Sequence, residues 1–438
     1  MPSAASEAKQ LLKLAWPVMI GQVGFMAMSV VDLVMVGRLG ETELAALAAG
    51  NIWAFGTMIP GIGLMLGLDP VFAQAHGSGK PREAGRALQR AVLLALLVSA
   101  PIIGLHLVAE DALRWLGQPE EILETAGAYN RALAWSVAPS LVFWSLKQFT
   151  QGLEVMRPAA VVVVIANLLN VVANEVFIFE LGLGAVGSGY ATSIVRAAMP
   201  LALVAMVVPL IRERWAPLRE ALEPRPLLAL LWRGGPVGLH TTMEVWAFNA
   251  IGVLMGWIGA TELAGHSIAL NMTAVAFCVS WGLSAAAATR VGNLLGAGKA
   301  WQRTGWIAIG TSLVIMGTSA AILLVFPSWL AAAYTPAVEV QGVILLLLPL
   351  AAAFQLFDGV QAVAAGVLRG AGDTRFPAVL ALLAFWILGV PLAAGLAFGL
   401  DLGARGLWIG LDAMLILFSL LLAWRVLHVG RLGGFRVV

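Results

Sequence analysis

Long apolar runs constrain the fold of this chain more than any other feature of its sequence. A helix needs about 20 apolar residues to cross a bilayer, because lipid offers the backbone no hydrogen-bond partners. Twelve runs near that length occur, and turn residues and charges separate them: 14–37, 50–72, 88–108, 126–147, 158–179, 186–210, 232–257, 266–289, 305–326, 341–365, 377–398 and 406–427. The sequence therefore predicts an all-α integral membrane protein with twelve transmembrane helices.

Composition supports a lipid-facing surface and excludes several classes of protein. Apolar residues make up 60% of the chain and charged residues 11%, which is too little polar surface to face water over 438 residues. The lone cysteine, Cys278, excludes an internal disulfide and a thiolate metal cluster. A net charge of +2 argues against nucleic acid as a partner. The first apolar run is too long for a cleavable signal peptide, so we expect it to remain as the first helix.

Basic residues indicate the orientation, because they are retained on the cytoplasmic side of the membrane. With the N-terminus inside, the cytoplasmic segments hold 21 of the 26 lysines and arginines, and the opposite loops hold four. This distribution predicts that both termini are cytoplasmic. Tryptophans near the run ends are typical of interface anchors: Trp115, Trp215, Trp232, Trp257, Trp301 and Trp329.

An internal repeat appears when 219 is added to a residue number. Thr42-Glu-Leu-Ala45 falls on Thr261-Glu-Leu-Ala264, and Pro158 falls on Pro377. The register is kept without gaps across six predicted helices. We therefore expect two homologous six-helix lobes, at 1–219 and 220–438, which enter the membrane in the same sense. In transporters with this architecture, two helix bundles move as rigid bodies around a binding site at the membrane midplane. The alternative is an old duplication kept only for packing, which would indicate no function.

The clearest acids inside the predicted spans are Asp32, Glu244 and Asp358. A charge at the centre of a transmembrane helix costs about 2.5–3.5 kcal/mol on insertion scales, so such residues mark function by default. The offset of 219 gives none of them an acidic counterpart. A carboxyl group held away from water can bind and release a proton or Na⁺, and the sequence does not choose between these ions.

Structural roles for these acids stay open. His240 lies four residues before Glu244 and could pair with it along one helix face. Asp358 could bond to the neighbouring Gln355 or Gln361.

Polar, aromatic and methionine side chains accompany the acids. Asn167, Asn170 and Asn174 recur at spacings of three and four, which puts them on one helix face. Aromatic rings attract organic cations, and methionine adapts to varied shapes. For a single tryptophan or methionine, however, packing is the commoner role. The residues in the spans that would suit a cationic ligand include Trp53, Met272, Phe354 and Gln361.

Two nucleotide-binding patterns fail. The glycines of 182–187 join two spans with no preceding soluble strand, so they form a turn. The Gly298-Lys299 pair lacks the other residues of a phosphate-binding loop, since Asn293 and Ala300 occupy their positions. We expect no nucleotide and no cofactor, with energy taken from an ion gradient.

Longer motifs resemble a known family. The runs Val31-Asp-Leu-Val-Met-Val-Gly-Arg-Leu-Gly40 and Arg290-Val-Gly-Asn-Leu-Leu-Gly-Ala-Gly-Lys299 are similar to those of the multidrug and toxic compound extrusion (MATE) family. So are Gly259-Ala-Thr-Glu-Leu-Ala264 after Glu244, and Leu368-Arg-Gly370 with Asp373-Thr374 after Asp358. The likeness covers nearly the whole chain, and the Glu and Asp point to the NorM-type branch.

The resemblance implies a secondary active exporter of cationic drugs and dyes, in exchange for Na⁺ or H⁺. By that likeness Glu244 and Asp358 would bind the coupling ion, and they would be the metal ligands if the ion is Na⁺. Asp32 would form a second polar site with Asn170 and Asn174, able to bind ion or substrate. Trp53, Met272, Phe354 and Gln361 are the further candidates for substrate contact.

The expected setting is the bacterial inner membrane, with lipids and small organic cations as partners and the chain as a monomer. Multidrug efflux of this kind gives antibiotic resistance. Two alternatives stay open. A lipid-linked glycan flippase would need a cationic cavity, for which Arg196 stands alone. A proton-conducting subunit would need lysines within the spans, and Lys147 lies at the end of one.

Overall fold

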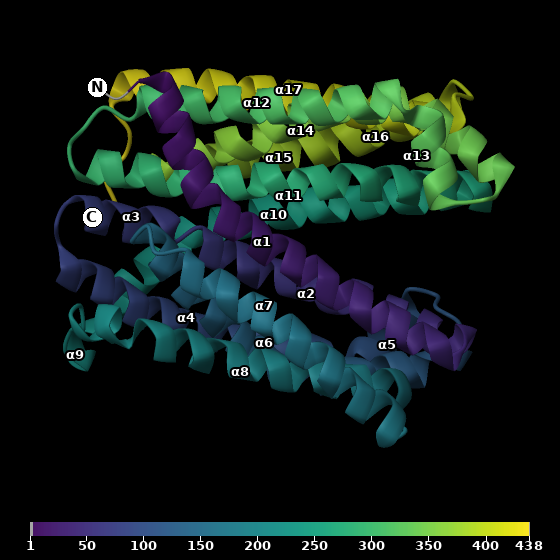
Figure 1. Ribbon diagram of the computed structural model, residues 1–438, viewed down its shortest axis with the longest axis horizontal. Coiled ribbons are helices and arrows are strands. Elements are labelled where there is room, and N and C mark those ends of the chain that lie inside the picture. The colour runs from purple at the N-terminus through teal and green to yellow at the C-terminus, as the bar shows by residue number, and fades with distance from the viewer. Residues whose placement is uncertain (1–2, 438) are drawn as a thin grey trace. The chain divides into compact units, whose positions relative to one another are not determined.

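The computed structural model describes residues 3–437, in which helices account for all regular structure and no strand occurs (Figure 1). These residues form twelve long helical segments: α1 (Ala4–Val36), α2 (Glu41–Leu66) with α3 (Asp69–Gly77), α4 (Pro81–Leu107), α6 (Glu120–Gly152), α7 (Arg157–Asn174) with η2 (Glu175–Glu180), α8 (Gly184–Arg212), α10 (Pro224–Ile258), α11 (Ala260–Gly296), α12 (Gln302–Val325), α14 (Val338–Gly370), α15 (Arg375–Ala381) with η3 (Leu382–Gly389), α16 (Val390–Ala394) and η4 (Gly395–Gly399), and α17 (Gly403–Leu432). Short helices lie between them: η1 (Gly37–Leu39), α5 (Ala109–Trp115), α9 (Leu218–Ala221) and α13 (Pro327–Tyr334). The prediction of twelve long helices is confirmed.

Most helices continue past the apolar runs that predict them. The run 266–289 lies inside α11, and the run 126–147 lies inside α6. Ten of the helical segments within residues 3–437 are apolar and long enough to cross a membrane, and α6 and α10 match them in length. The ends are polar because a helix can extend into the lipid headgroup region, where water satisfies exposed side chains.

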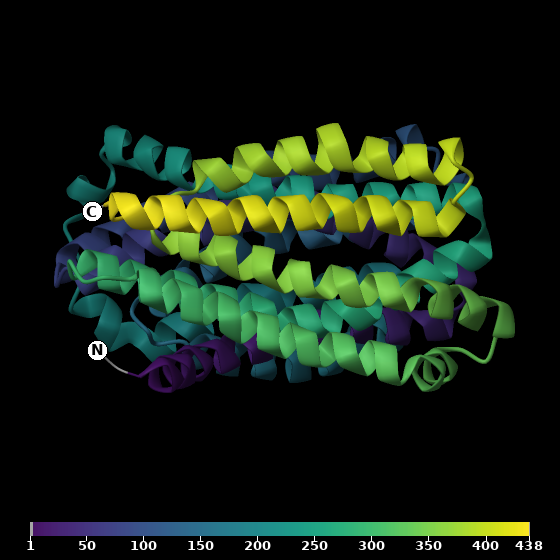
Figure 2. The same ribbon diagram turned by 90° about the horizontal axis from the view of Figure 1, so that it is seen from above.

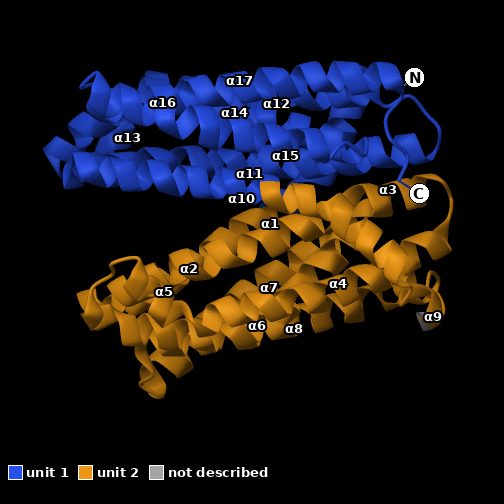
Figure 3. Ribbon diagram, turned by 180° about the vertical axis from the view of Figure 1, so that it is seen from behind, with its two compact units in different colours: residues 1–19, 240–437 blue, residues 20–239, 438 orange. Residues whose placement is uncertain are grey.

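The chain divides into two compact units (Figure 3). Unit 1 contains residues 1–19 and 240–437, and unit 2 contains residues 20–239. Two helices are therefore shared: α1 changes unit after Met19, and α10 changes unit after Leu239. The lobe boundary after residue 219 describes a duplication of sequence rather than a set of contacts, and it stays a prediction.

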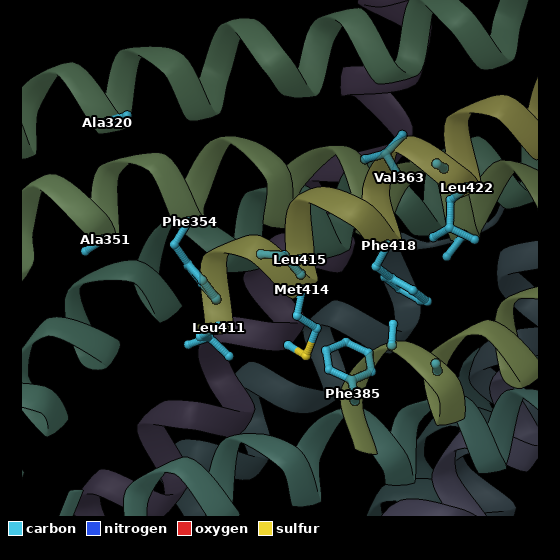
Figure 4. Close-up of a cluster of buried hydrophobic side chains, with 14 of the residues drawn as sticks. Ala320, Ala351, Phe354, Val363, Phe385, Leu411, Met414, Leu415, Phe418 and Leu422 are labelled. Atoms are coloured by element: carbon cyan, nitrogen blue, oxygen red, sulfur yellow. The ribbon is translucent and has the colours of Figure 1, made fainter. Parts of the chain in front are cut away.

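Each unit is built around one central helix. In unit 2, α6 packs against α2, α4 and α8, and in unit 1, α14 packs against α11, α12 and α17. The core of unit 1 is aromatic and aliphatic, and the buried rings of Phe385 and Phe418 lie 5.1 Å apart beside Met414 (Figure 4). Lipid is as apolar as these side chains, so close packing rather than exclusion of water stabilises such contacts.

The backbone repeats the sequence offset of 219. To within one residue, the same offset relates the starts of the central helices α6 and α14, at residues 120 and 338, and those of the π-helical segments η2 and η4, at 175 and 395. Residues with positive φ also recur: Gly184 (59°) with Gly403 (53°), and Gly182 (64°) with Asp401 (52°). Left-handed backbone conformation is rare outside glycine, so these paired positions reflect the same turns built twice.

Candidate functional site

A cluster of neutral hydrogen-bond donors surrounds Asp32 in unit 2. Asn174 of α7 donates from Nδ2 to Asp32 Oδ1 at 2.6 Å, and Thr192 of α8 donates from its hydroxyl to Asp32 Oδ2 at 3.1 Å. Asn170 lies one turn before Asn174, and it bonds to both Asn174 and Thr192. All four side chains are buried. These donors are neutral and hold the carboxyl in place, and the cationic Arg196 of α8 lies close enough to interact with the charge of an ionised Asp32.

A second acidic cluster lies in unit 1, where Gln361 connects two carboxyl groups. Its Nε2 donates to Glu244 Oε1 at 2.7 Å and to Asp358 Oδ1 at 3.2 Å. Glu244 comes from α10, whereas Asp358 and Gln361 lie three residues apart on α14. Asp358 and Gln361 are buried, and the side chain of Glu244 is 14% exposed. One amide group thus brings the two acids to a common point.

The acidic cluster favours the binding of a small cation. Two ionised carboxylates at one amide repel each other, and a proton or a metal ion between them removes that repulsion. Gln361 Oε1 is buried without a hydrogen-bond partner among the described residues, so a third oxygen accompanies the acids. Oxygen ligands of this kind suit hard cations. Within residues 3–437 no group of three or more His, Cys, Asp and Glu side chains could hold a metal ion, so any Na⁺ here would rely on neutral oxygens as well.

His240 lies beside the acidic cluster. Its Nε2 is 3.9 Å from Glu244 Oε2, one helical turn away on α10. The imidazole ring packs 5.6 Å from the ring of Phe418. The expected pairing along one helix face therefore exists as a contact at the edge of ion-pair distance. A protonated His240 would compete with any small cation for Glu244.

The remaining predicted residues lie outside these two clusters. Trp53 donates from its indole to the Leu105 carbonyl in unit 2 at 2.9 Å. Phe354 and Met272 are buried in the core of unit 1, and the Phe354 ring lies 5.8 Å from both Phe248 and Trp408. Asn167 bonds to the Val163 carbonyl of its own helix. Contacts of this kind occur in ordinary helix packing and do not by themselves indicate a binding site.

Sequence reasoning missed three buried residues. Thr192 completes the shell of Asp32, and a lone threonine in an apolar run gives no signal for that role. Asp69 of α3 accepts hydrogen bonds from Gln148 and Gln151 of α6. Asp412 of α17 is 7% exposed, and its Oδ1 has no hydrogen-bond partner within the described chain. Both aspartates lie inside predicted spans, so the criterion that found the other acids could have found them.

Comparison with known proteins identifies the family. The sequence model described as MatE matches residues 17–176 and again residues 236–394. The chain belongs to the MatE family. The two matches of this MatE chain begin 219 residues apart, which equals the offset of its internal repeat.

Relatives and solved structures agree with the MatE assignment. A probable multidrug resistance protein NorM from Mesorhizobium japonicum is 34% identical, with 98% of this chain and 95% of the relative covered. The multidrug resistance protein NorM of Vibrio cholerae is 33% identical, with 96% and 95% covered. A crystal structure of the eukaryotic MATE transporter AtDTX14 superposes with a TM-score of 0.91 at 23% identity and covers 99% of both chains. The predicted family and fold are confirmed, and this MatE chain is a multi-pass membrane protein of a transporter family.

Proposed function

We propose that this MatE protein exports cationic organic drugs or dyes by antiport against Na⁺ or H⁺. The observation that carries the proposal is the shared contact of Glu244 and Asp358 with Gln361 inside the spans of unit 1. Buried acids with a common neutral donor can exchange a proton or a small cation at little structural cost. The names of the NorM relatives support multidrug resistance as the class of function.

The two acidic clusters take different roles in this proposal. Glu244 and Asp358 bind the coupling ion, and Asp32 with Asn170 and Asn174 forms a second site for ion or substrate. Both clusters attract cations, which disfavours the glycan flippase because an anionic pyrophosphate needs a cationic cavity. Lys147 is 5% exposed and lies 4.0 Å from the Trp144 ring, so it is more buried than its place near a helix end suggests. One buried lysine still makes a poor proton-conducting chain.

The setting follows from the same proposal. The protein works as a monomer in the bacterial inner membrane with both termini in the cytoplasm, and it needs no nucleotide or cofactor. A dye-efflux assay in inverted vesicles tests the proposal, with a Na⁺ gradient and a pH gradient imposed separately. At least one of the two gradients should drive dye movement. Dye movement that responds to neither gradient would remove the antiport mechanism.

A further inference from the structure

Arg196 is a permanent positive charge in the middle of α8. It lies twelve residues after Gly184, where α8 begins, and sixteen before Arg212, where α8 ends. The long helices of each unit run along its length (Figure 2), so Arg196 is far from both ends of its span. Arginine stays ionised in proteins, and a charge at this depth in a membrane span marks function by default.

The side of α8 that carries Arg196 faces the interior of unit 2. Thr192 lies four residues before Arg196 and Met199 three after it, so the three side chains share one face of the helix. Thr192 and Met199 are buried, whereas Ile194 and Leu201 on the opposite face are exposed. Arg196 itself is only partly buried. Its side chain therefore keeps accessible surface on the inward face of α8.

The charge of Arg196 acts on three other helices of unit 2. It interacts electrostatically with Asp32 of α1, Tyr129 of α6 and His106 of α4. Within residues 3–437, however, no hydrogen bond or ion pair joins the Arg196 guanidinium to another residue. Charges inside proteins are ordinarily paired. The N–H donors of this guanidinium are therefore available to a ligand.

Asp32 lies near Arg196 without being joined to it. Thr192 donates to one Asp32 oxygen and precedes Arg196 by one turn of α8, so one helix places both groups beside the acid. Asn174 donates to the other Asp32 oxygen. Each carboxyl oxygen thus has a neutral donor, and the two opposite charges remain separate. In a structural ion pair the guanidinium would contact the carboxylate directly.

Two separate and opposite charges favour a ligand that carries both. A simple cation that Asp32 attracts is repelled by Arg196, and a simple anion meets the reverse. A zwitterion gains at both ends, because its cationic group can approach Asp32 while its carboxylate accepts hydrogen bonds from Arg196. The planar guanidinium matches a carboxylate with two parallel hydrogen bonds.

We propose that Asp32 and Arg196 together bind a zwitterionic substrate, with its cationic group at Asp32 and its carboxylate at Arg196. This role rests on the proposed function, and it extends the substrates of the second site from organic cations to molecules that carry both charges. The alternative is that Arg196 only offsets the charge of Asp32 and contacts no ligand. The two cases differ in their response to a ligand that lacks the carboxylate.

Two matched dyes test this proposal on the purified full-length protein. One is a rhodamine with a free carboxylate, which is a zwitterion at neutral pH, and the other is its methyl ester, which is a cation. Fluorescence polarisation titrations in detergent give a dissociation constant for each dye. The site variants are Arg196→Gln and the charge-preserving Arg196→Lys. The control is Arg38→Gln, which removes an exposed arginine of unit 2. Thermal unfolding checks that each variant folds.

We expect Arg196→Gln to weaken binding of the free acid about tenfold, since hydrogen bonds between ionised groups are among the strongest in proteins. The ester should bind as tightly as before or more tightly, because the repelling charge is gone. Arg196→Lys should bind the free acid more tightly than Arg196→Gln does, and Arg38→Gln should match the wild type for both dyes. An equal change for both dyes in Arg196→Gln would overturn the carboxylate site, because Arg196 would then act only through the charge of Asp32.

The wild type distinguishes failure of this proposal from failure of the proposed function. We expect it to bind both dyes. Binding of the ester without the free acid would overturn the zwitterion site and leave the export of organic cations intact. Binding of neither dye would contradict both.

Discussion

Gln361 Nε2 lies 2.7 Å from Glu244 Oε1, and this hydrogen bond joins α14 to α10. The same nitrogen reaches Asp358 one turn away, so one neutral side chain links two acids. An arrangement of this kind makes the occupancy of one carboxyl depend on the other, because a proton or cation on either changes what the amide contacts.

Neutralising either acid should stop transport while the protein remains folded. Glu244→Gln and Asp358→Asn keep size and hydrogen bonding but remove the charge that holds the coupling ion. We expect ion-driven dye efflux to fall to the background rate in each variant, measured in vesicles with equal amounts of protein. Glu339→Gln is the matched control, since it removes an exposed acid from the start of α14. Normal efflux in either site variant would contradict the assignment.

Removing the side-chain amide of Gln361 should change the ion concentration that drives half-maximal efflux. Gln361→Leu deletes two hydrogen bonds to acids, and bonds to charged groups contribute about 1.5–3 kcal/mol each. Loss of even one such bond corresponds to about tenfold or more in an equilibrium constant, so the ion concentration for half-maximal efflux should shift by at least about tenfold. Gln355→Leu is the control, because this buried glutamine of α14 bonds to Ser319 instead. A shift of the same size in both variants would mean that loss of any buried glutamine disturbs the helix.

Dye affinity should fall as the coupling ion rises. A carboxylate that already carries H⁺ or Na⁺ attracts a cationic dye less, so binding of ethidium should weaken at low pH, at high Na⁺, or under both conditions. Linkage requires that the dye weaken ion binding by the same factor. Equilibrium dye titrations on purified protein across pH and Na⁺ measure this. An affinity that stays constant in both series would leave an uncoupled carrier or a flippase.

The Asp32 cluster should contribute to dye binding separately. Asp32→Asn removes the negative charge, while Asn174 and Thr192 remain next to the side chain. We expect weaker dye binding in this variant even where ion binding at Glu244 survives. The same titrations, with ion binding followed in parallel, separate the two effects. Unchanged dye affinity would leave Asp32 with a structural role.

The loops after Lys80 and Lys299 should lie on the same side of the membrane. Each lysine follows a glycine with φ of 68°, Gly79 or Gly298, so the two turns have the same geometry at corresponding places in the repeat. Reporter domains inserted after each lysine should both report cytoplasm. Reporters found on opposite sides would overturn the parallel arrangement of the two halves.

A close helix contact in unit 1 should be sensitive to one methyl group. A Cβ on Gly366 would meet the Ser284 side chain at 2.4 Å and its carbonyl oxygen at 2.5 Å. Gly366→Ala must therefore separate α14 from α11, at a cost of about 1–3 kcal/mol. Gly342→Ala in the same helix meets nothing within 4 Å and should be harmless. Thermal unfolding in detergent compares the two, and equal stability would contradict the close contact.

Sequence periodicity predicted those contacts that lie within one helix. The spacing of Asn170 and Asn174 places them on one face of α7, and they bond to each other. The bond from Gln361 to Asp358 joins residues three positions apart on one helix, so it could be predicted from spacing in the same way. Contacts between helices could not be predicted in this way, because the bond between Asp32 of α1 and Thr192 of α8 depends on how those two helices pack. Periodicity shows which residues share a face of a helix, whereas the residues that contact that face depend on the tertiary packing.

The tryptophans also separate what sequence position predicts from what tertiary packing decides. Five of the six predicted anchors are exposed, from 55% at Trp215 to 94% at Trp115, as lipid-facing rings should be. The prediction for Trp301 was wrong. This residue is 1% exposed, and its indole donates to the Gly433 carbonyl of the C-terminal segment. Sequence places Trp301 at the end of a span, but the return of the chain after α17 covers it.

The assignment of the start of α1 to unit 1 has a consequence for biosynthesis. Glu7 is synthesised before its partner Arg290, which follows 283 residues later. At about 5–20 residues per second, the interval is about 15–60 s. The first helix must therefore wait in the membrane with an unneutralised carboxylate until α11 and α12 have been made. Unit 1 is therefore completed late, and it depends on a segment that is synthesised long before the rest of the unit.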